Sequence, residues 1–448
     1  MPNFRASQVG VTQGARAYAR ASASNAHRST ASSLPDQDRR RLVALAPFQV
    51  PLRGRAAWQL ATTGIGYFGL IATMYASIEV SVLLTLALAF PAGGLVVRLF
   101  IIQHDCGHGS FFRSRRANTF AGIFCSLITL TPYENWRRQH ANHHAVWNNL
   151  DRRDSGMDIY STCLTVREYG ALPRCRRWLY RAARHPAVSQ VLLPPLVFLI
   201  LYRFAFDTPA SWRRERISVY LTDLGILVAA TVLVLTFGAE RAALVQLPTM
   251  VVASITGMWI FSVQHRFEDA RWFRSDTWNS IDAALHGSSY LKLPRVLQWF
   301  SGNIGFHHIH HLLPRIPNYR LQACHEACPD ISGNARVLTF RQALLAPTFA
   351  LWDEERGRMM GFPRVAWRSL FPERRTAGAI LFGRSGLGVL RSKHLRRGAN
   401  SRQRVVRSYL GRTTAGPSCM GRPWMIKPSR CAPNCARSAT ILQSALRS

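Results

Sequence analysis

The chain lacks three sequence signatures that are typical of common redox cofactors. It contains no glycine-rich Rossmann fingerprint for a flavin or nicotinamide dinucleotide, no Cys-x-x-Cys-His haem-attachment motif and no cysteine spacing typical of an iron–sulfur cluster. Its nine cysteines are odd in number and form no disulfide framework, which favours reduced thiols in a reducing compartment. Redox chemistry in this chain would therefore need another cofactor and a separate electron carrier.

Acidic residues are also scarce. The 448 residues include 57 Lys and Arg but 23 Asp and Glu, which gives a formal net charge of +34. Residues 376–448 contain fourteen basic side chains, no acidic one and no sustained periodicity, so we expect residues 363–448 to form a disordered basic tail. Residues 1–47, rich in Ala, Ser and Arg, are expected to be disordered as well. Because the tail inflates the net charge, this charge does not predict a nucleic-acid partner.

Long apolar runs are present, and they predict an integral membrane protein. Four stretches with at most one charge approach or exceed the roughly 20 residues that cross a bilayer: 56–78, 80–97, 217–237 and 242–263. Short polar turns at Glu79 and at Glu240-Arg241 join them in pairs, which predicts two helical hairpins. Arginines flank the base of each hairpin, so the positive-inside rule places both bases in the cytoplasm.

Two further apolar stretches are too short or too interrupted to span a bilayer. Residues 187–202 carry Pro194-Pro195 at their middle and arginines on both flanks, which predicts an interfacial or re-entrant segment. Residues 120–130 are expected to lie along the interface. A fifth crossing at residues 187–202 would put the last of the three histidine clusters, at residues 307–311, on the wrong side of the membrane.

Eight of the fifteen histidines fall into three clusters, each just beyond an apolar stretch. Their patterns are H-x3-H, H-x2-H-H and H-x2-H-H: His104 and His108; His140, His143 and His144; His307, His310 and His311. Residues three and four apart share a helix face, so each cluster can present imidazoles to one site. A lone histidine beside a membrane helix is more often a hydrogen-bonding residue, but three clusters predict a metal centre. Eight ligands exceed the roughly four of one zinc ion and suit two redox irons.

The three clusters and their flanking residues resemble the membrane fatty-acid desaturases, most closely the bacterial acyl-lipid type. The resemblance covers about residues 48–362 and rests on HDCGH (104–108), ENWRRQHANHH (134–144), NLDRRD (149–154), LTVREY (164–169), VQHRFED (263–269) and GNIGFHHIHHLLPRIPNYRL (302–321). It implies an all-α integral membrane protein with four transmembrane helices and a cytoplasmic helical cap. It also implies that the eight clustered histidines hold a non-haem di-iron centre.

Other residues are candidates for the same site. His265 follows the fourth apolar stretch directly and fits as a ninth ligand, although it could instead interact with the helix dipole. His308 occupies an off-face position of its cluster, and His286 is a weaker candidate. Three polar side chains are candidates to orient the ligands or a water: Asp105, Glu134 and Asn303.

The resemblance implies dioxygen-dependent insertion of a double bond into a fatty-acyl chain, carried on a membrane lipid of the bacterial inner membrane. An unactivated methylene offers no acidic proton and no carbonyl, so its oxidation needs a metal-based oxidant. The active site would face the cytoplasm and receive electrons from a ferredoxin or a b-type cytochrome. Two alternatives stay open: a related di-iron hydroxylase or ketolase acting on a lipid or carotenoid, and a metal-transporting or metal-sensing membrane protein. The second would place ligands within the membrane helices.

Overall fold

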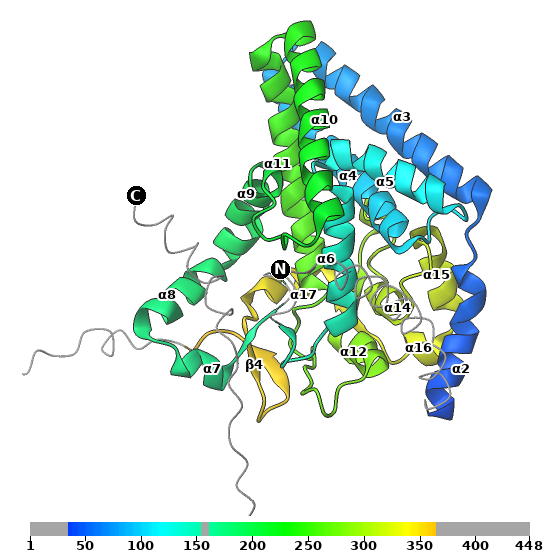
Figure 1. Cartoon of the computed structure of the whole chain (residues 1–448), viewed down its shortest axis with the longest axis vertical. Coiled ribbons are helices and arrows are strands. Elements are labelled where there is room, and N and C mark those ends of the chain that lie inside the picture. The colour runs from blue at the N-terminus through cyan, green and yellow to red at the C-terminus, as the bar shows by residue number, and fades with distance from the viewer. Residues whose placement is uncertain (1–34, 154–159, 161, 364–448) are drawn as a thin grey trace, which may run out of the picture. The chain divides into compact units, whose positions relative to one another are not determined.

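Four long helices dominate the structure, a computed structural model that describes residues 35–153, 160 and 162–363. They are α3 (Arg53–Ser77), α4 (Val82–His108), α10 (Arg213–Phe237) and α11 (Ala239–Val263). In Figure 1 the upper ends of these helices project to one side, and the shorter elements gather toward the other. The predicted all-α fold is confirmed in part, because the described residues are mostly helical.

Shorter helices connect and cover the long ones. They are α2 (Asp36–Leu45), α5 (Arg115–Thr129), α6 (Tyr133–Val146), α7 (Val166–Ala171), α8 (Arg174–Ala183), α9 (Leu193–Leu199), α12 (Ser280–Gly287), α13 (Arg295–Phe300), α14 (His307–Leu312), α15 (Asn318–Ala327), α16 (Pro329–Ser332) and α17 (Phe340–Leu345). A π-helical segment, Ala187–Leu192, precedes α9. The α2 helix lies within residues 1–47, where disorder was expected, and it buries Leu45 completely.

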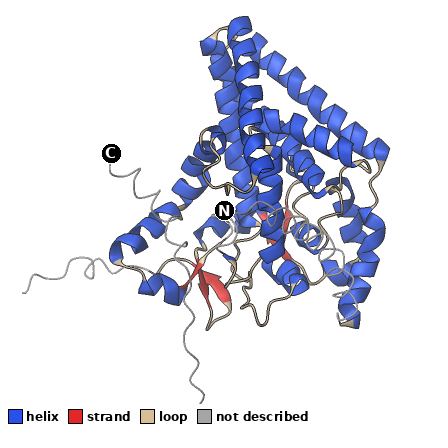
Figure 2. Ribbon diagram, viewed as in Figure 1, coloured by secondary structure: helices blue, strands red, loops and turns tan. Residues whose placement is uncertain are grey.

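Five short strands among the described residues are the exception to the predicted all-α fold. A three-stranded sheet pairs β1 (Leu164–Thr165) parallel to β4 (Leu351–Asp353), which pairs antiparallel to β5 (Arg358–Met360). A second sheet pairs β2 (Ser289–Lys292) parallel to β3 (Arg336–Thr339). Figure 2 shows both sheets among the shorter elements, away from the upper ends of the long helices. Strands this short leave no periodic pattern that the sequence could reveal.

Three of the long helices among the described residues are apolar enough to cross a membrane: α4, α10 and α11. The predicted first span, residues 56–78, forms the 25-residue helix α3, which falls short in hydropathy because polar residues such as Gln59 and Thr63 occupy its buried face. A fourth span would be possible if α8 and residues 187–203, bent by 52°, crossed together. The break lies just before residues 187–202, the segment expected to be interfacial or re-entrant.

The predicted second span is longer than expected. Helix α4 does not end near Val97 but continues to His108, so the first histidine cluster lies on the spanning helix itself. Arg98, which suggested the end of the span, donates to Thr63 Oγ1 at 3.2 Å and lies 4.1 Å from the centre of the Trp299 ring. A long side chain can place its charge this way without interrupting its helix.

The turns of the two predicted hairpins lie together. Glu79, between α3 and α4, forms an ion pair with Arg241 at 2.7 Å, and the rings of Tyr75 and Phe237 stack at 4.0 Å. Gly238 joins α10 to α11 with a φ of 87°, a conformation that favours glycine. This arrangement supports hairpins that enter the membrane from one side, although the two-hairpin topology and the cytoplasmic cap stay predictions.

We expect Gly93→Ala to destabilise the protein by about 1–3 kcal/mol, the usual cost of overpacking. A Cβ atom at Gly93 on α4 would lie 2.7 Å from Val252 Cγ1 and 3.0 Å from the backbone nitrogen of Ala253 on α11. Small residues let membrane helices approach closely, so the added methyl group must push the two helices apart. Thermal unfolding in detergent measures the loss. Gly64→Ala, where a Cβ would meet nothing within 4 Å, is the control; equal stability of both variants would contradict the close packing.

The predicted disordered ends fall largely outside the described residues. Residues 1–34 and 364–448 are not described, so the expected properties of the N-terminal segment and of the basic tail stay predictions.

Candidate metal centre

Four structural elements bring all nine candidate histidines together. Helix α4 carries the first cluster, α6 the second and α14 the third, and His265 follows the end of α11 directly. The ligand nitrogens fall into two groups, within each of which all atoms lie within 4.8 Å of one another. The first group contains His104, His108, His140, His144 and His310; the second contains His143, His265 and His311. His307 adjoins the second group, because its Nε2 atom lies 3.0 Å from His265 Nε2.

The nitrogens of the first group converge more closely than hydrogen bonding alone explains. His310 Nε2 lies 3.1 Å from His104 Nε2 and 3.0 Å from His144 Nε2, which in turn lies 3.1 Å from His140 Nε2. A neutral imidazole has one N–H and one lone pair, so a single proton on His310 cannot serve both neighbours. Buried His108 Nε2 has no hydrogen-bond partner within the described chain. Converging lone pairs of this kind fit a bound cation.

Asp105 sets the orientation of His104. Its Oδ1 atom lies 3.0 Å from His104 Nδ1, and a carboxylate accepts hydrogen bonds, so Nδ1 carries the proton and Nε2 presents its lone pair to the group. The other oxygen accepts from the backbone N–H and the amide of Asn318 at 2.6 and 2.8 Å. Gln59 on α3 donates to Asn318 Oδ1 at 2.9 Å. A buried network thus links α3, α15 and the histidines.

Burial favours the neutral imidazole at four of these histidines. It lowers the pKa of His140 and His310 well below the usual range, with further contributions from His144 and from His104, respectively. The pKa of His265 and of His311 in the second group is lowered in the same way, first by burial. Metal ligation requires the neutral imidazole, so these residues hold the form that binds a metal at neutral pH.

Trp147 covers the second group. The centre of its indole ring lies 3.9 Å from the ring of His265, 4.9 Å from that of His143 and 5.5 Å from that of His311. Buried His311 Nε2 has no hydrogen-bond partner among the described residues. The indole therefore packs against all three imidazoles and restricts access of water to them.

Comparison with known proteins decides the family. The sequence model of the family described as "Fatty acid desaturase" matches residues 80–342, which include all three histidine clusters. This chain belongs to the fatty acid desaturase family. The resemblance predicted from the histidine clusters is confirmed, and the protein is an enzyme.

Three relatives show how far the desaturase likeness extends. A "Fatty acid desaturase" of Bacillus subtilis is 41% identical over 321 residues, which cover 72% of this chain and 90% of the relative. An "sn-1 oleoyl-lipid 12-desaturase" of Synechocystis is 25% identical over 276 residues, 61% of this chain and 74% of the relative. An "sn-1 acyl-lipid omega-3 desaturase (ferredoxin)", also of Synechocystis, is 27% identical over 293 residues, 60% and 76% of the two chains.

The other residues that were candidates for the metal site of this desaturase have partners outside the two histidine groups. Glu134 engages Arg137 at 3.3 Å and Arg214 at 2.6 Å, so each of its oxygens faces an arginine. Asn303 accepts from Gln298 at 3.1 Å. Neither metal-binding group contains His286, which is half-exposed, or His308, whose ring faces Tyr290 and His325, as its off-face position predicted.

Sequence reasoning assigned no role to Asn318, although it stands in the LPRIPNY run on which the family resemblance partly rested. Its backbone N–H and its amide together hold Asp105, which only the fold reveals.

We expect Asp105→Asn to weaken metal binding by about 10–100-fold, as is usual when a residue that hydrogen-bonds a metal ligand is replaced. An amide has one accepting oxygen in place of two, and its NH2 group only donates, so it cannot accept from His104 with one terminal atom and from Asn318 with the other, as the carboxylate does. Metal retained after dialysis against graded chelator measures the loss. Asp276→Asn, at an exposed position, is the control. Equal retention by the two variants would contradict the role of Asp105.

Proposed function

We propose that this desaturase uses dioxygen and a pair of histidine-bound iron ions to insert a double bond into a fatty-acyl chain esterified to a membrane lipid. The observation that carries the proposal is the convergence of nine imidazoles in two adjoining groups beside the ends of apolar helices. Nine imidazoles exceed the roughly four ligands of one tetrahedral zinc ion. The first group would hold one ion; the second group and His307 would hold the other.

The residues around the site have defined tasks in this reaction. Iron bound here would supply the oxidising power from dioxygen that an unactivated methylene requires. In the balanced reaction a CH2–CH2 pair loses two hydrogen atoms, dioxygen becomes two waters, and two electrons and two protons come from outside. Asp105 orients His104, and Trp147 keeps water from the second group. The protein must also hold one methylene pair close to the site.

The names of the relatives support the substrate and the electron donor. Two Synechocystis relatives are named for acyl or oleoyl groups on lipids, and one of these names includes ferredoxin. We extend both features to this protein: a lipid-linked acyl chain and an external carrier, either a ferredoxin or a b-type cytochrome. The carrier is required because the chain has no sequence motif for a flavin, nicotinamide, haem or iron–sulfur group of its own.

Lipid analysis in a host that lacks desaturases tests the proposed reaction. Cells that express the protein should contain acyl chains two hydrogens lighter by gas chromatography and mass spectrometry, and cells that express His310→Ala should not. An oxygenated product would instead identify a hydroxylase or ketolase. Altered cellular metal content without a new lipid would favour a metal transporter or sensor.

Tag accessibility tests the proposed location in the inner membrane with the site facing the cytoplasm. Tags at the N-terminus, near Arg152 and after His311 should all be cytoplasmic, because the hairpin bases carry arginines. A tag near Glu79 or Glu240 should be periplasmic, since Glu79 contacts Arg241 at the far ends of the hairpins. A periplasmic tag after His311 would mean that the bent segment formed by α8 and residues 187–203 crosses the membrane.

A further inference from the structure

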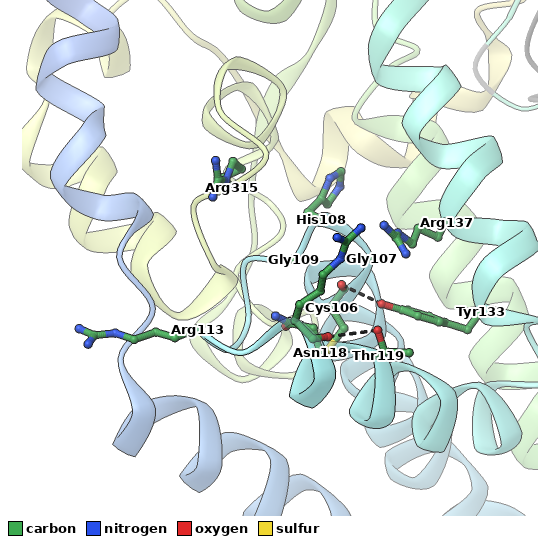
Figure 3. A pocket seen from close by; sticks show the side chains of 11 residues that line it. Cys106, Gly107, His108, Gly109, Arg113, Asn118, Thr119, Tyr133, Arg137 and Arg315 are labelled. Atoms are coloured by element: carbon green, nitrogen blue, oxygen red, sulfur yellow. Dashed lines mark hydrogen bonds between the residues drawn. The ribbon is translucent and has the colours of Figure 1, made fainter. Parts of the chain in front are cut away.

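A basic cavity lies beside the first histidine group. Its volume is about 370 Å³, in the usual range for small-molecule sites. The last turn of α4, the first turn of α5, side chains of α6 and the loop before α15 form its wall (Figure 3). The wall includes four arginines, Arg113, Arg115, Arg137 and Arg315, and none of the eleven described residues that line it is acidic.

Two of these arginines carry charge that no carboxylate offsets. In the described parts of the chain, Arg115 and Arg315 form no ion pair. Both are exposed at the cavity, where their charge can reach a ligand. Guanidinium groups gathered in a concave site repel one another unless an anion binds between them, and their planar donors match phosphate oxygens.

The other two arginines differ in their surroundings. Arg137 lies 3.3 Å from Glu134, a carboxylate that it shares with Arg214, so part of its charge stays available. Arg113 donates to the carbonyl of Pro51 at 3.3 Å, and in Figure 3 it extends away from the labelled groups around His108. We therefore count Arg115, Arg137 and Arg315 as the anion-binding set.

Helix α5 indicates the depth of the cavity in the membrane. It begins at Arg115, and its outer face exposes Phe120 and Ile123, with 78% and 48% of their surface accessible. A helix with arginines at one end and a strip of exposed apolar side chains lies in the interface between headgroups and hydrocarbon. The positive end of its dipole also points toward the cavity. An interfacial α5, as the sequence predicts for residues 120–130, would bring the cavity to the level of lipid phosphates.

His108 connects the cavity to the reaction site. It lines the cavity and belongs to the group of five histidines. In Figure 3 it lies between Arg315 and Arg137. An anion in the cavity would therefore lie next to the metal centre, where a substrate rather than a distant effector is expected.

We propose that this cavity binds the phosphate of the substrate's headgroup, so that the acyl chain to be desaturated belongs to an anionic phospholipid. This inference rests on the proposed desaturation of a lipid-linked acyl chain and adds the chemical class of the headgroup. The phosphate anchors the lipid on Arg115, Arg137 and Arg315, and its acyl chain passes from there toward the histidines.

Equilibrium binding to the full-length protein in neutral detergent tests this site without turnover. The probes are dioctanoyl phosphatidylglycerol, uncharged dioctanoylglycerol and inorganic phosphate. Arg115→Gln/Arg315→Gln should bind the phospholipid at least ~10-fold more weakly, because charge-assisted hydrogen bonds are lost. The matched control, Arg116→Gln/Arg295→Gln, removes the same charge from exposed residues outside the cavity and should change binding less than about 2-fold.

Each result decides the question. Stronger binding of the phospholipid than of dioctanoylglycerol, lost in the cavity variant alone, supports the proposal. Three results would overturn the proposal. The two lipids could bind equally well, or both double variants could lose phospholipid affinity equally. Inorganic phosphate could also bind tightly and resist displacement by the phospholipid. Loss of ferredoxin binding with unchanged phospholipid binding would assign the arginines to a protein partner and overturn it too. If the cavity variant fails to fold, Arg315→Gln and the charge-retaining Arg315→Lys give the same comparison.

The test of the phosphate site can fail or succeed independently of the test of desaturation. Binding is measured without dioxygen or reductant, so an inactive enzyme that still selects the phospholipid would refute desaturation and not the phosphate site. Desaturation of an uncharged lipid alone would refute the phosphate site and not the reaction.

Discussion

Replacing His310 by alanine is expected to abolish desaturation and to remove metal from the first histidine group. His310 Nε2 is within 3.1 Å of the Nε2 atoms of both His104 and His144, so it stands at the centre of that group. Loss of a residue that hydrogen-bonds a metal ligand typically lowers metal affinity or activity by roughly 10–100-fold. Loss of the ligand itself should lower both by more. Acyl-lipid analysis of cells and metal analysis of the purified protein measure the two effects.

Two histidine variants outside the groups serve as controls. His286→Ala changes a half-exposed residue and should leave both activity and metal content near wild type. His308→Ala removes a buried ring two positions from His310, so it should lower stability but retain metal and substantial activity. If His308→Ala lost as much metal as His310→Ala, the separation of on-face and off-face positions would be wrong.

Removal of the metal should inactivate the enzyme and lower its thermal stability. Without a cation the converging lone pairs of the first group lack partners, and a ligand that binds the folded state at 100 times its Kd stabilises by about 2.7 kcal/mol. Chelation in detergent followed by thermal unfolding measures this loss. Adding Fe²⁺ should restore activity and stability, whereas Zn²⁺ should restore stability without activity. Activity that survives complete chelation would contradict a metal-dependent reaction.

The sequence predicted the histidine set but not its division into two groups. Spacings of three and four residues identify shared helix faces, and all nine predicted histidines adjoin in the structure. Consecutive residues differ in direction by about 100° on a helix. His143 and His144 therefore point to different groups, as do His310 and His311. Which group each one joins depends on how α6 and α14 pack, and no local pattern contains that information.

The extent of the helices was predicted less well. A charge was taken as the end of the second span, but Arg98 finds polar and aromatic partners inside the fold, and α4 continues through the first histidine cluster. Helix α3 has close to the predicted length, yet its buried face includes Gln59, which joins the network of Asn318, beside apolar residues that pack in the core. Tertiary contacts determined both outcomes, so a reading of hydropathy along the chain could not predict them.

The central claim is that the nine histidines hold two iron ions. Elemental analysis of the purified full-length protein, combined with Mössbauer spectroscopy of protein grown on ⁵⁷Fe, tests it most directly. The account predicts about two irons per chain in nitrogen-rich coordination, as nine imidazoles exceed the needs of one ion. One stoichiometric zinc ion per chain, in protein that desaturates lipids, would contradict it.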